Sequence, residues 1–282
     1  MALFRRSKKD AFAKVEAFLD EYQVPSFPGA INEVLGKLRE DDTTNGDIAA
    51  SLEADPGMSI RVLQMVNAPG FGLRHRVDDV SQAVQLIGRS PLESILISLA
   101  IKDVLPMKSR PGFDAVAFWR AAAQRAGIAS RMAARLHPPD RSFCWTAALL
   151  QDVAIPLLVD YAGERYCEIL EAWSQGGEPL ADLELETLGF DHADLGRKIS
   201  ELWNLSDRLS EAIAGHHAPP TLDTAPVRLV SFIRATSREG EGQPAGVSEL
   251  LAAAESLELD RDDCGSYVEE GLADAKEMSG LF

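Results

Sequence analysis

The stretch Ala147-Ala148-Leu149-Leu150-Gln151-Asp152-Val153-Ala154-Ile155-Pro156-Leu157-Leu158-Val159 decides how the rest of the chain is interpreted. An apolar run of this length predicts one helix that is buried on most of its circumference. A carboxylate inside such a helix needs a partner or a metal to offset its loss of hydration. Asp152, with Gln151 beside it, is therefore the first candidate functional position of the chain.

Composition and charge narrow the classes of function. The chain has 282 residues, of which 46% are hydrophobic and 26% charged, and its formal net charge is −16. Such an acidic chain is a poor binder of nucleic acid or anionic membranes, because phosphate binding needs a concentrated positive field. The three cysteines, Cys144, Cys167 and Cys264, lie far apart and form no Cys-x-x-Cys motif, which favours a reducing cytoplasm over a disulfide framework.

The N-terminus does not resemble a signal peptide. Four basic residues lie within Met1 to Asp10, but no apolar segment of sufficient length follows them. We find no later run of membrane-spanning length by inspection. The sequence therefore predicts a cytoplasmic protein without a membrane span.

Apolar residues recur at helical spacing along the whole chain, and no alternating strand pattern is visible. We therefore predict an all-α, two-lobed helical bundle. Proline and glycine in Pro106 to Gly112 indicate a linker between the lobes. The expected divisions are a basic tail with an amphipathic helix (1–23), an N-terminal helical lobe (24–105), the linker (106–113), a second helical lobe (114–240) and an acidic C-terminal extension with helices (241–282).

The amphipathic helix expected over Ala11 to Tyr22 has two interpretations. Such a stripe usually packs on its own domain. The sharper interpretation is a docking helix for a membrane or a partner protein.

Several separate motifs occur in an order that resembles the HDOD domain, a bacterial module in which a small helical lobe precedes a degenerate HD-type helical lobe. The resemblance implies an HD-domain-like second lobe. It covers about Val24 to Thr236 and rests on Asp55-Pro56, Leu63-Gln64-Met65-Val66-Asn67-Ala68, Gly72, Val80 to Gly88, Phe118-Trp119, Leu149 to Leu158, Leu188-Gly189-Phe190-Asp191-His192, Gly196, Trp203 and His216-His217.

Catalytic relatives of that fold, including the HD-GYP phosphodiesterases, hold two or more metals through a His, a His-Asp pair, a further His, a His-His pair and a final Asp. Carried over to this chain, the resemblance implies that Ala121 and Gln151 stand where two histidine ligands would be, and Arg234 where the last Asp would be. The resulting vestigial cavity would contain Gln151, Asp152, His192, His216, His217 and Arg234.

Too few ligands remain for a complete catalytic metal centre, which needs both firm ligands and open positions for water. We expect no cofactor; any divalent Fe, Mn or Mg would be held by Asp152, His192, His216 and His217. The plainer alternative is structural. Asp152 would pair with Arg234, His192 would belong to a capping turn beside Asp191, and the His216-His217 pair would end a helix.

Three functions follow from these observations. The leading one is a non-enzymatic signal-transduction module that binds signalling proteins through its helical lobes. The alternatives are a residual metal-dependent phosphohydrolase, and a sensor that binds a nucleotide or another anion through Arg234 and the histidines. A homodimer and a cyclic nucleotide ligand are left open.

A candidate interaction loop lies in the first lobe, between Pro69 and Arg76. It offers apolar and cationic side chains of the kind that anchor protein interfaces. In the alternative interpretation its apolar residues cover the core and its arginines pair with Asp78 and Asp79. Asn67, just before the loop, is expected to cross-link the turn. The candidate contact residues are Phe71, Leu73, Arg74 and Arg76.

Overall fold

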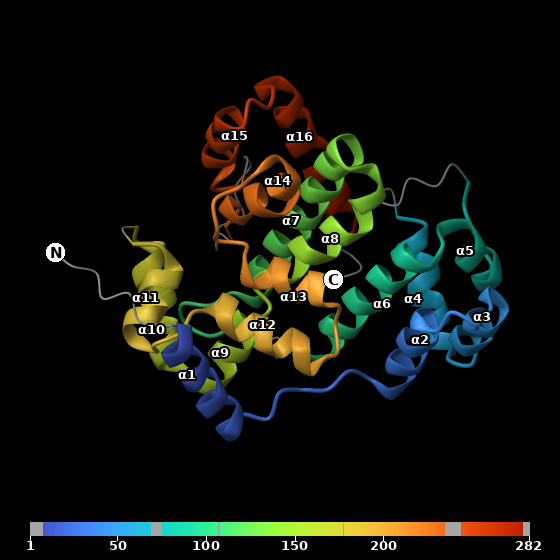
Figure 1. Ribbon diagram of the computed structural model, residues 1–282, viewed down its shortest axis with the longest axis horizontal. Coiled ribbons are helices and arrows are strands. Elements are labelled where there is room, and N and C mark those ends of the chain that lie inside the picture. Colours follow the sequence, from blue (N-terminus) through green and yellow to red (C-terminus); the bar gives the residue numbers. More distant parts are fainter. Residues whose placement is uncertain (1–7, 69–74, 107, 177, 235–243, 279–282) are drawn as a thin grey trace.

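The fold is entirely helical in the computed structural model, which describes residues 8–68, 75–106, 108–176, 178–234 and 244–278 (Figure 1). Within these ranges the β pairing is limited to one isolated bridge between Arg110 and Phe113, in the segment that joins the two lobes. The predicted all-α class is confirmed.

Helix starts in the first lobe follow the capping residues of the sequence. Asp55 accepts a hydrogen bond from the Met58 amide ahead of Pro56, and Asp79 accepts one from the Gln82 amide. Gly88 separates two helices and has a φ of 78°, a backbone conformation that a residue with a Cβ adopts only under strain. The helices are α1 (Lys8–Glu21), α2 (Gly29–Arg39), α3 (Asn45–Glu53), α4 (Pro56–Val66), α5 (Val80–Ile87) and α6 (Arg89–Val104).

The second lobe is built around the long Ala-rich helix α7, which Asp114 caps. After Arg228 the α-helix gives way to a 3-10 turn. The elements are α7 (Ala115–Leu136), η2 (Pro138–Asp140), α8 (Arg141–Leu150), α9 (Ala154–Ala162), α10 (Glu164–Ser174), α11 (Leu180–Thr187), α12 (His192–Leu202), α13 (Asp207–Ala214), η3 (Leu222–Thr224), α14 (Ala225–Arg228), η4 (Leu229–Phe232), α15 (Val247–Ser256) and α16 (Arg261–Met278).

The stretch 147–159 is two helices, not the single continuous helix that its apolarity predicts. α8 ends at Leu150 and α9 begins at Ala154. Pro156 has no amide hydrogen to donate to the carbonyl of Asp152, and its ring crowds that carbonyl. The Ile155 amide donates to the Asp152 carbonyl instead, over 2.9 Å, in a tighter turn. Asp152 therefore lies in a break between helices.

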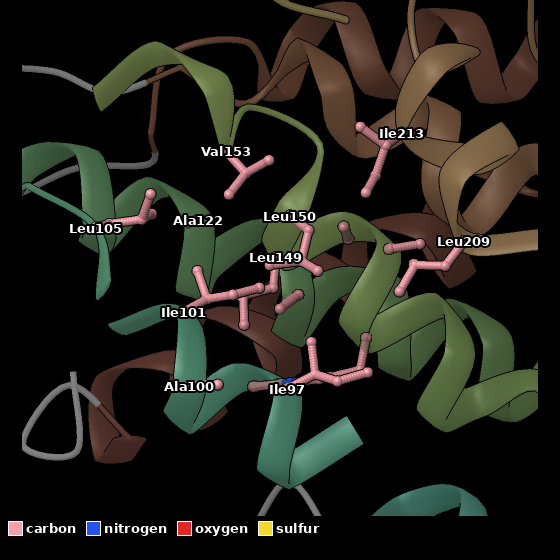
Figure 2. Packing of buried hydrophobic residues seen from close by; sticks show 14 of the residues in the cluster. Ile97, Ala100, Ile101, Leu105, Ala122, Leu149, Leu150, Val153, Leu209 and Ile213 are labelled. Atoms are coloured by element: carbon pink, nitrogen blue, oxygen red, sulfur yellow. The ribbon is translucent and has the colours of Figure 1, made fainter. Parts of the chain in front are cut away.

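One continuous cluster of buried apolar residues runs through both lobes. Figure 2 shows its centre, where Ile97 and Ile101 of α6 lie near Leu149 of α8, with Ile213 of α13 beyond. The α6 helix of the first lobe therefore contributes directly to the core of the second lobe, and the lobes share their interior.

Helix α1 packs on the second lobe, against α12. Phe18, 4% exposed, lies among the rings of Tyr22, Tyr161 and Phe190. Of the two interpretations of this amphipathic helix, packing accounts for most of its apolar face, although Phe12 stays 55% exposed and the lobe that the helix covers is not the one that follows it in sequence.

The acidic C-terminal extension contains helices, as predicted, and the longer of them, α16, has 18 residues and packs along α7. The two helices cross at Gly127 and Gly271, where a Cβ on Gly271 would lie 2.4 Å from the Ile128 nitrogen. Only glycine allows backbones to approach this closely. Arg131 of α7 then binds Asp274 and Glu270 across the same interface.

One helical stretch, Pro138–Ala162, is apolar and long enough to cross a membrane by composition, which inspection of the sequence did not anticipate. Of its most apolar window, 83% is buried inside the protein. Its apolarity is thus accounted for by the shared core.

Candidate functional site

Three separate segments bring a carboxylate and three imidazoles together in the second lobe. Asp152 lies in the break between α8 and α9, and His192 is the first residue of α12, which Asp191 and Asp194 cap reciprocally. His216 and His217 lie in the turn that follows α13. The structure thus joins four of the six residues that the sequence placed in one cavity.

The imidazoles converge through their Nε2 atoms. His192 Nε2 lies 3.3 Å from His216 Nε2 and 2.8 Å from His217 Nε2. The Oδ1 atom of Asp152 lies 3.5 Å from His192 Nε2 and 3.4 Å from His216 Nε2. We call these four side chains the histidine cluster. His192 and His216 are each 1% exposed, whereas His217 lies at the surface.

Groups behind the cluster hold two of the rings in place. His216 Nδ1 donates to the Ile213 carbonyl over 2.6 Å, and His192 Nδ1 is 2.6 Å from Glu184 Oε2. Tyr166 donates its hydroxyl to the other oxygen of Glu184. Because these Nδ1 atoms carry the hydrogens, the Nε2 atoms of both rings are directed toward the cluster centre.

The cation next to Asp152 is Arg125 of α7, a residue that the sequence analysis did not single out. Its Nη2 atom lies 2.9 Å from Asp152 Oδ2, and its side chain is 3% exposed. Nη1 donates to the Ile233 carbonyl over 3.1 Å. Arg125 follows Ala121 by one helical turn on the same face of α7, so its guanidinium lies near the position that the resemblance gives to a missing histidine.

Charge in the cluster is compensated locally. Burial opposes ionisation of Asp152, but Arg125 and the neighbouring imidazoles of His192 and His216 outweigh it and hold the pKa of this carboxyl well below its ordinary value. Burial likewise opposes charge on His192, yet Glu184 and Asp152 raise its pKa well above the ordinary value. Partial burial of the ring on its cluster side, together with the neighbouring imidazoles, lowers the pKa of His217 to about 2.

The donor set fits one transition-metal ion. Metal–nitrogen bonds of about 2.0–2.1 Å place neighbouring ligand atoms about 2.9–3.4 Å apart in tetrahedral or octahedral geometry. The Nε2 separations of 2.8 and 3.3 Å match those edges, and the three ligand nitrogens lie within 4.8 Å of one another. The buried Glu184 behind His192 is the carboxylate–histidine support that metal sites use.

Arg234 and Gln151 are not linked to the cluster in the way that the sequence predicted. Arg234 is exposed and its Nη2 lies 3.4 Å from Glu249 Oε1, so the predicted Asp152–Arg234 pair is wrong. Gln151 is 1% exposed, and its Oε1 has no hydrogen-bond partner in the described part of the chain. The predicted role of Arg234 in anion sensing loses its basis.

The candidate interaction loop is described only in part. Phe71, Leu73 and Arg74 lie outside the described residues. Arg76 is exposed and its Nε lies 3.2 Å from Asp78 Oδ1, as the alternative interpretation predicts. Asn67 forms the expected cross-link: its Nδ2 donates to the Leu63 and Val77 carbonyls, and its Oδ1 accepts from the Val77 amide.

The fold and the histidine cluster define an HD-like all-helical protein. Comparison with known families then gives the narrower class: the model of the HDOD domain matches residues 24–219, more than half of the chain. The chain belongs to the HDOD domain family, as its motifs indicated.

Similar solved structures agree on the fold. An HDOD domain protein of unknown function from Geobacter sulfurreducens is 18% identical, has a TM-score of 0.75 and covers 98% of this chain and 99% of its own. A protein from Shewanella amazonensis, assigned provisionally as a phosphohydrolase, is 23% identical, with a TM-score of 0.73 and coverage of 95% and 98%.

One curated relative was found at significant similarity, an uncharacterized protein of Treponema pallidum (strain Nichols). It is 24% identical over 208 residues, which are 70% of this chain. The match spans only 38% of the length of that relative.

Proposed function

We propose that this chain is a non-catalytic regulatory module of bacterial signal transduction, which acts by binding partner proteins on a degenerate HD-type scaffold. The observation that carries the proposal is the ion pair between Arg125 and Asp152. A guanidinium on Oδ2 competes with any second metal at this carboxylate, and it neither binds nor activates water as a metal does.

The surrounding residues support the same conclusion. Ala121 has no ligand atom, and Gln151 offers a neutral amide where an imidazole would be, which is a weak ligand for transition metals. A two-metal phosphohydrolase mechanism requires both ions to clamp the attacking and leaving oxygens. The donors that remain suffice for one ion.

A turnover assay tests the proposal most directly. Protein purified without chelator is supplied with Mn²⁺ or Fe²⁺ and assayed on bis(p-nitrophenyl) phosphate and on a cyclic dinucleotide, beside Asp152→Ala. We expect wild type and variant to give the same background rate. Turnover of about 1 per second or more that Asp152→Ala abolishes would overturn the non-catalytic assignment.

Partner binding is tested separately, at the candidate interaction loop. The triple substitution Phe71→Ala, Arg74→Ala and Arg76→Ala is expected to reduce recovery of partners from a lysate of the native organism without changing the melting temperature. Recovery at wild-type levels would place the binding surface elsewhere.

A second candidate function rests on the convergence of the three Nε2 atoms. In this alternative His192, His216, His217 and Asp152 hold one divalent metal, which when bound would polarise a phosphate oxygen or a water molecule. Binding would release the proton from His192, because a ligating imidazole must be neutral. The role would be a metal-dependent sensor or a residual phosphohydrolase.

Metal analysis separates the two candidates. Under the second, elemental analysis and Co²⁺ titration give one ion per chain with visible absorption bands of bound cobalt, and His192→Ala removes both. His137→Ala is the matched control, since that ring is held elsewhere by the Leu222 carbonyl. If wild-type protein contains no metal and Co²⁺ yields no bands, the cluster is a purely hydrogen-bonded remnant.

A further inference from the structure

Residues that follow the matched HDOD domain reach back toward the histidine cluster. The family model matches residues 24–219, and the chain then continues through α14, η4, α15 and α16. We call residues 244–278, which contain α15 and α16, the C-terminal arm. Helix α15 contacts η4, and α16 packs along α7, the helix that carries Arg125 (Figure 1). The arm therefore adjoins the element that supplies the cation of the cluster.

The position of the Arg125 guanidinium depends on one carbonyl group. In the described part of the chain its directed hydrogen bond is the one from Nη1 to the Ile233 carbonyl, over 3.1 Å. Its Nη2 lies 2.9 Å from Asp152 Oδ2, but without the alignment of a bidentate pair. Ile233 is 1% exposed and directly follows η4. The Ile233 carbonyl therefore holds the guanidinium in its place beside Asp152.

The C-terminal arm fixes the backbone on both sides of Ile233. On one side, the Arg234 amide donates to the Ala245 carbonyl over 3.1 Å. On the other side, Gly246 approaches the Phe232 carbonyl so closely that a Cβ would lie 1.7 Å from that oxygen. Gly246 also has a φ of 96°, which a residue with a Cβ rarely adopts. Because both neighbours of Ile233 are held by the arm, the Ile233 carbonyl moves when the arm moves.

The arm also meets α7 close to Arg125 itself. Gly127, two residues further along the helix, is where α16 crosses α7 with backbone in contact. One element thus fixes both the helix that carries the arginine and the carbonyl that the arginine binds. Support from two directions is what holds a buried side chain in a defined geometry.

We propose that the C-terminal arm regulates the histidine cluster: through the Ile233 carbonyl it keeps Arg125 on Asp152, and displacement of the arm would free this carboxylate for a divalent metal ion. This role of the arm rests on the proposed function, in which the Arg125–Asp152 pair competes with a metal. A guanidinium occupies the ligand atom Oδ2 and repels a second cation at short range. The arm thereby sets the metal affinity of the cluster.

Two backbone variants loosen the arm and leave the cluster residues unchanged. Arg234→Pro removes the amide hydrogen bond to the arm, and Ile233 has a ψ of 116°, close to the extended conformation that a residue before proline prefers. Gly246→Ala pushes the arm away from η4. Arg234→Ala is the matched control for the first variant, since it loses the same side chain but keeps the amide. Gly265→Ala is the control for the second, because a Cβ there meets nothing within 4 Å.

Co²⁺ titration of the full chain, followed by the visible bands of bound cobalt, measures the metal affinity. Arg125→Met is expected to tighten binding at least about tenfold, because the repelling charge is gone. Arg234→Pro and Gly246→Ala should each tighten it at least about threefold, because the arginine then leaves Asp152 for part of the time. Both control variants should keep the wild-type affinity. Adding Arg234→Pro to Arg125→Met should give no further gain, since the arm acts through that arginine.

The possible results separate the role of the arm from the proposed function. If Arg125→Met tightens binding but neither backbone variant does, the arm does not control the cluster, while the proposed function stands. If Arg125→Met leaves the affinity unchanged, the ion pair does not exclude a metal, and the proposed function fails together with the role of the arm. A full additional gain in the double variant would show that the arm does not act through Arg125. Thermal melting identifies a backbone variant that does not fold, in which case the other one decides.

Discussion

Two arginines of α7, six residues apart, bind carboxylates in opposite ways. Arg131 binds Asp274 with two well-directed bonds, of 2.6 Å from Nε and 2.7 Å from Nη2, and its Nη1 binds Glu270. Arg125 lies 2.9 Å from Asp152 through Nη2, but neither that atom nor Nε forms a directed hydrogen bond in the described part of the chain.

This difference in hydrogen bonding distinguishes an arginine that only joins two helices from one that belongs to a candidate functional site. Bidentate pairing uses the guanidinium fully and is the strong form of this interaction. A buried arginine with unused donors, next to three converging imidazole nitrogens, is the kind of incompletely satisfied polar group that structures keep at functional positions. Arg131 fastens α16 to α7, whereas Arg125 supplies the positive charge of the histidine cluster.

Arg125→Met is expected to have the largest effect on stability. It leaves the Asp152 carboxylate without its cation in the interior, and breaking a buried pair from one side costs about 3–5 kcal/mol. Urea unfolding measures the loss. The double variant Arg125→Met with Asp152→Asn should recover part of it, because the uncompensated charge is then gone. A double variant as unstable as the single one would contradict the ion-pair account.

Gly271→Ala tests the close crossing of α16 and α7. The new Cβ would meet backbone atoms of Ile128 at 2.4 and 2.5 Å, which side-chain motion cannot relieve, so we expect a loss of about 2 kcal/mol. Gly265→Ala is the matched control on the same helix, where a Cβ meets nothing within 4 Å. There alanine should stabilise by up to about 1 kcal/mol through helix propensity. If both variants shift the melting temperature in the same direction, the tight crossing is refuted.

Arg131→Met should cost less than the same change at Arg125, about 1.5 kcal/mol. Its side chain is 30% exposed, and Asp274, although buried, keeps the positive charge of Arg141 nearby, which partly compensates for the lost bonds. Chemical denaturation of the two methionine variants side by side gives the comparison directly. If Arg131→Met lost more unfolding free energy than Arg125→Met, the structural role would belong to Arg125 and the role in the site to Arg131.

Arg234→Ala should have the smallest effect, below about 0.5 kcal/mol, because its pair with Glu249 is exposed at both ends. Its removal should also leave the NMR chemical shifts of His192, His216 and His217 unchanged, whereas Arg125→Met shifts them. Altered histidine signals in Arg234→Ala would restore this residue to the site.

Local signals in the sequence predicted much of the fold. Asp55, Asp79 and Asp191 are residues of the capping type and each begins a helix, and the family motifs correctly indicated that Asp152 and the three histidines lie together. These predictions succeed because a cap acts over three residues and because the motifs occur in a fixed order along a known scaffold. The HDOD family was correctly named on the same basis.

The wrong predictions concern contacts between residues that are far apart in the sequence, which the spacing of residues does not reveal. Arg125 interrupts an otherwise small and apolar surface of α7, between Ala121 and Gly127, and a charged residue in such a setting was a usable signal of a buried pair. Arg234 was placed in the cavity by the family resemblance alone, and its side chain is exposed and pairs with Glu249 instead. The break in the helix at Asp152 could have been predicted from Pro156, four residues later.

Asn67 has a consequence for how freely the segment after it can vary. Its single amide binds the backbone at Leu63 and Val77, so a side chain fixes the two ends of the intervening segment. Lengthening a segment whose ends are already fixed carries only a slowly growing entropic penalty, about 0.6 kcal/mol for each doubling. We therefore expect insertions between residues 68 and 76 to leave α4 and α5 undisturbed, which makes this clasp a suitable point for grafting other binding sequences.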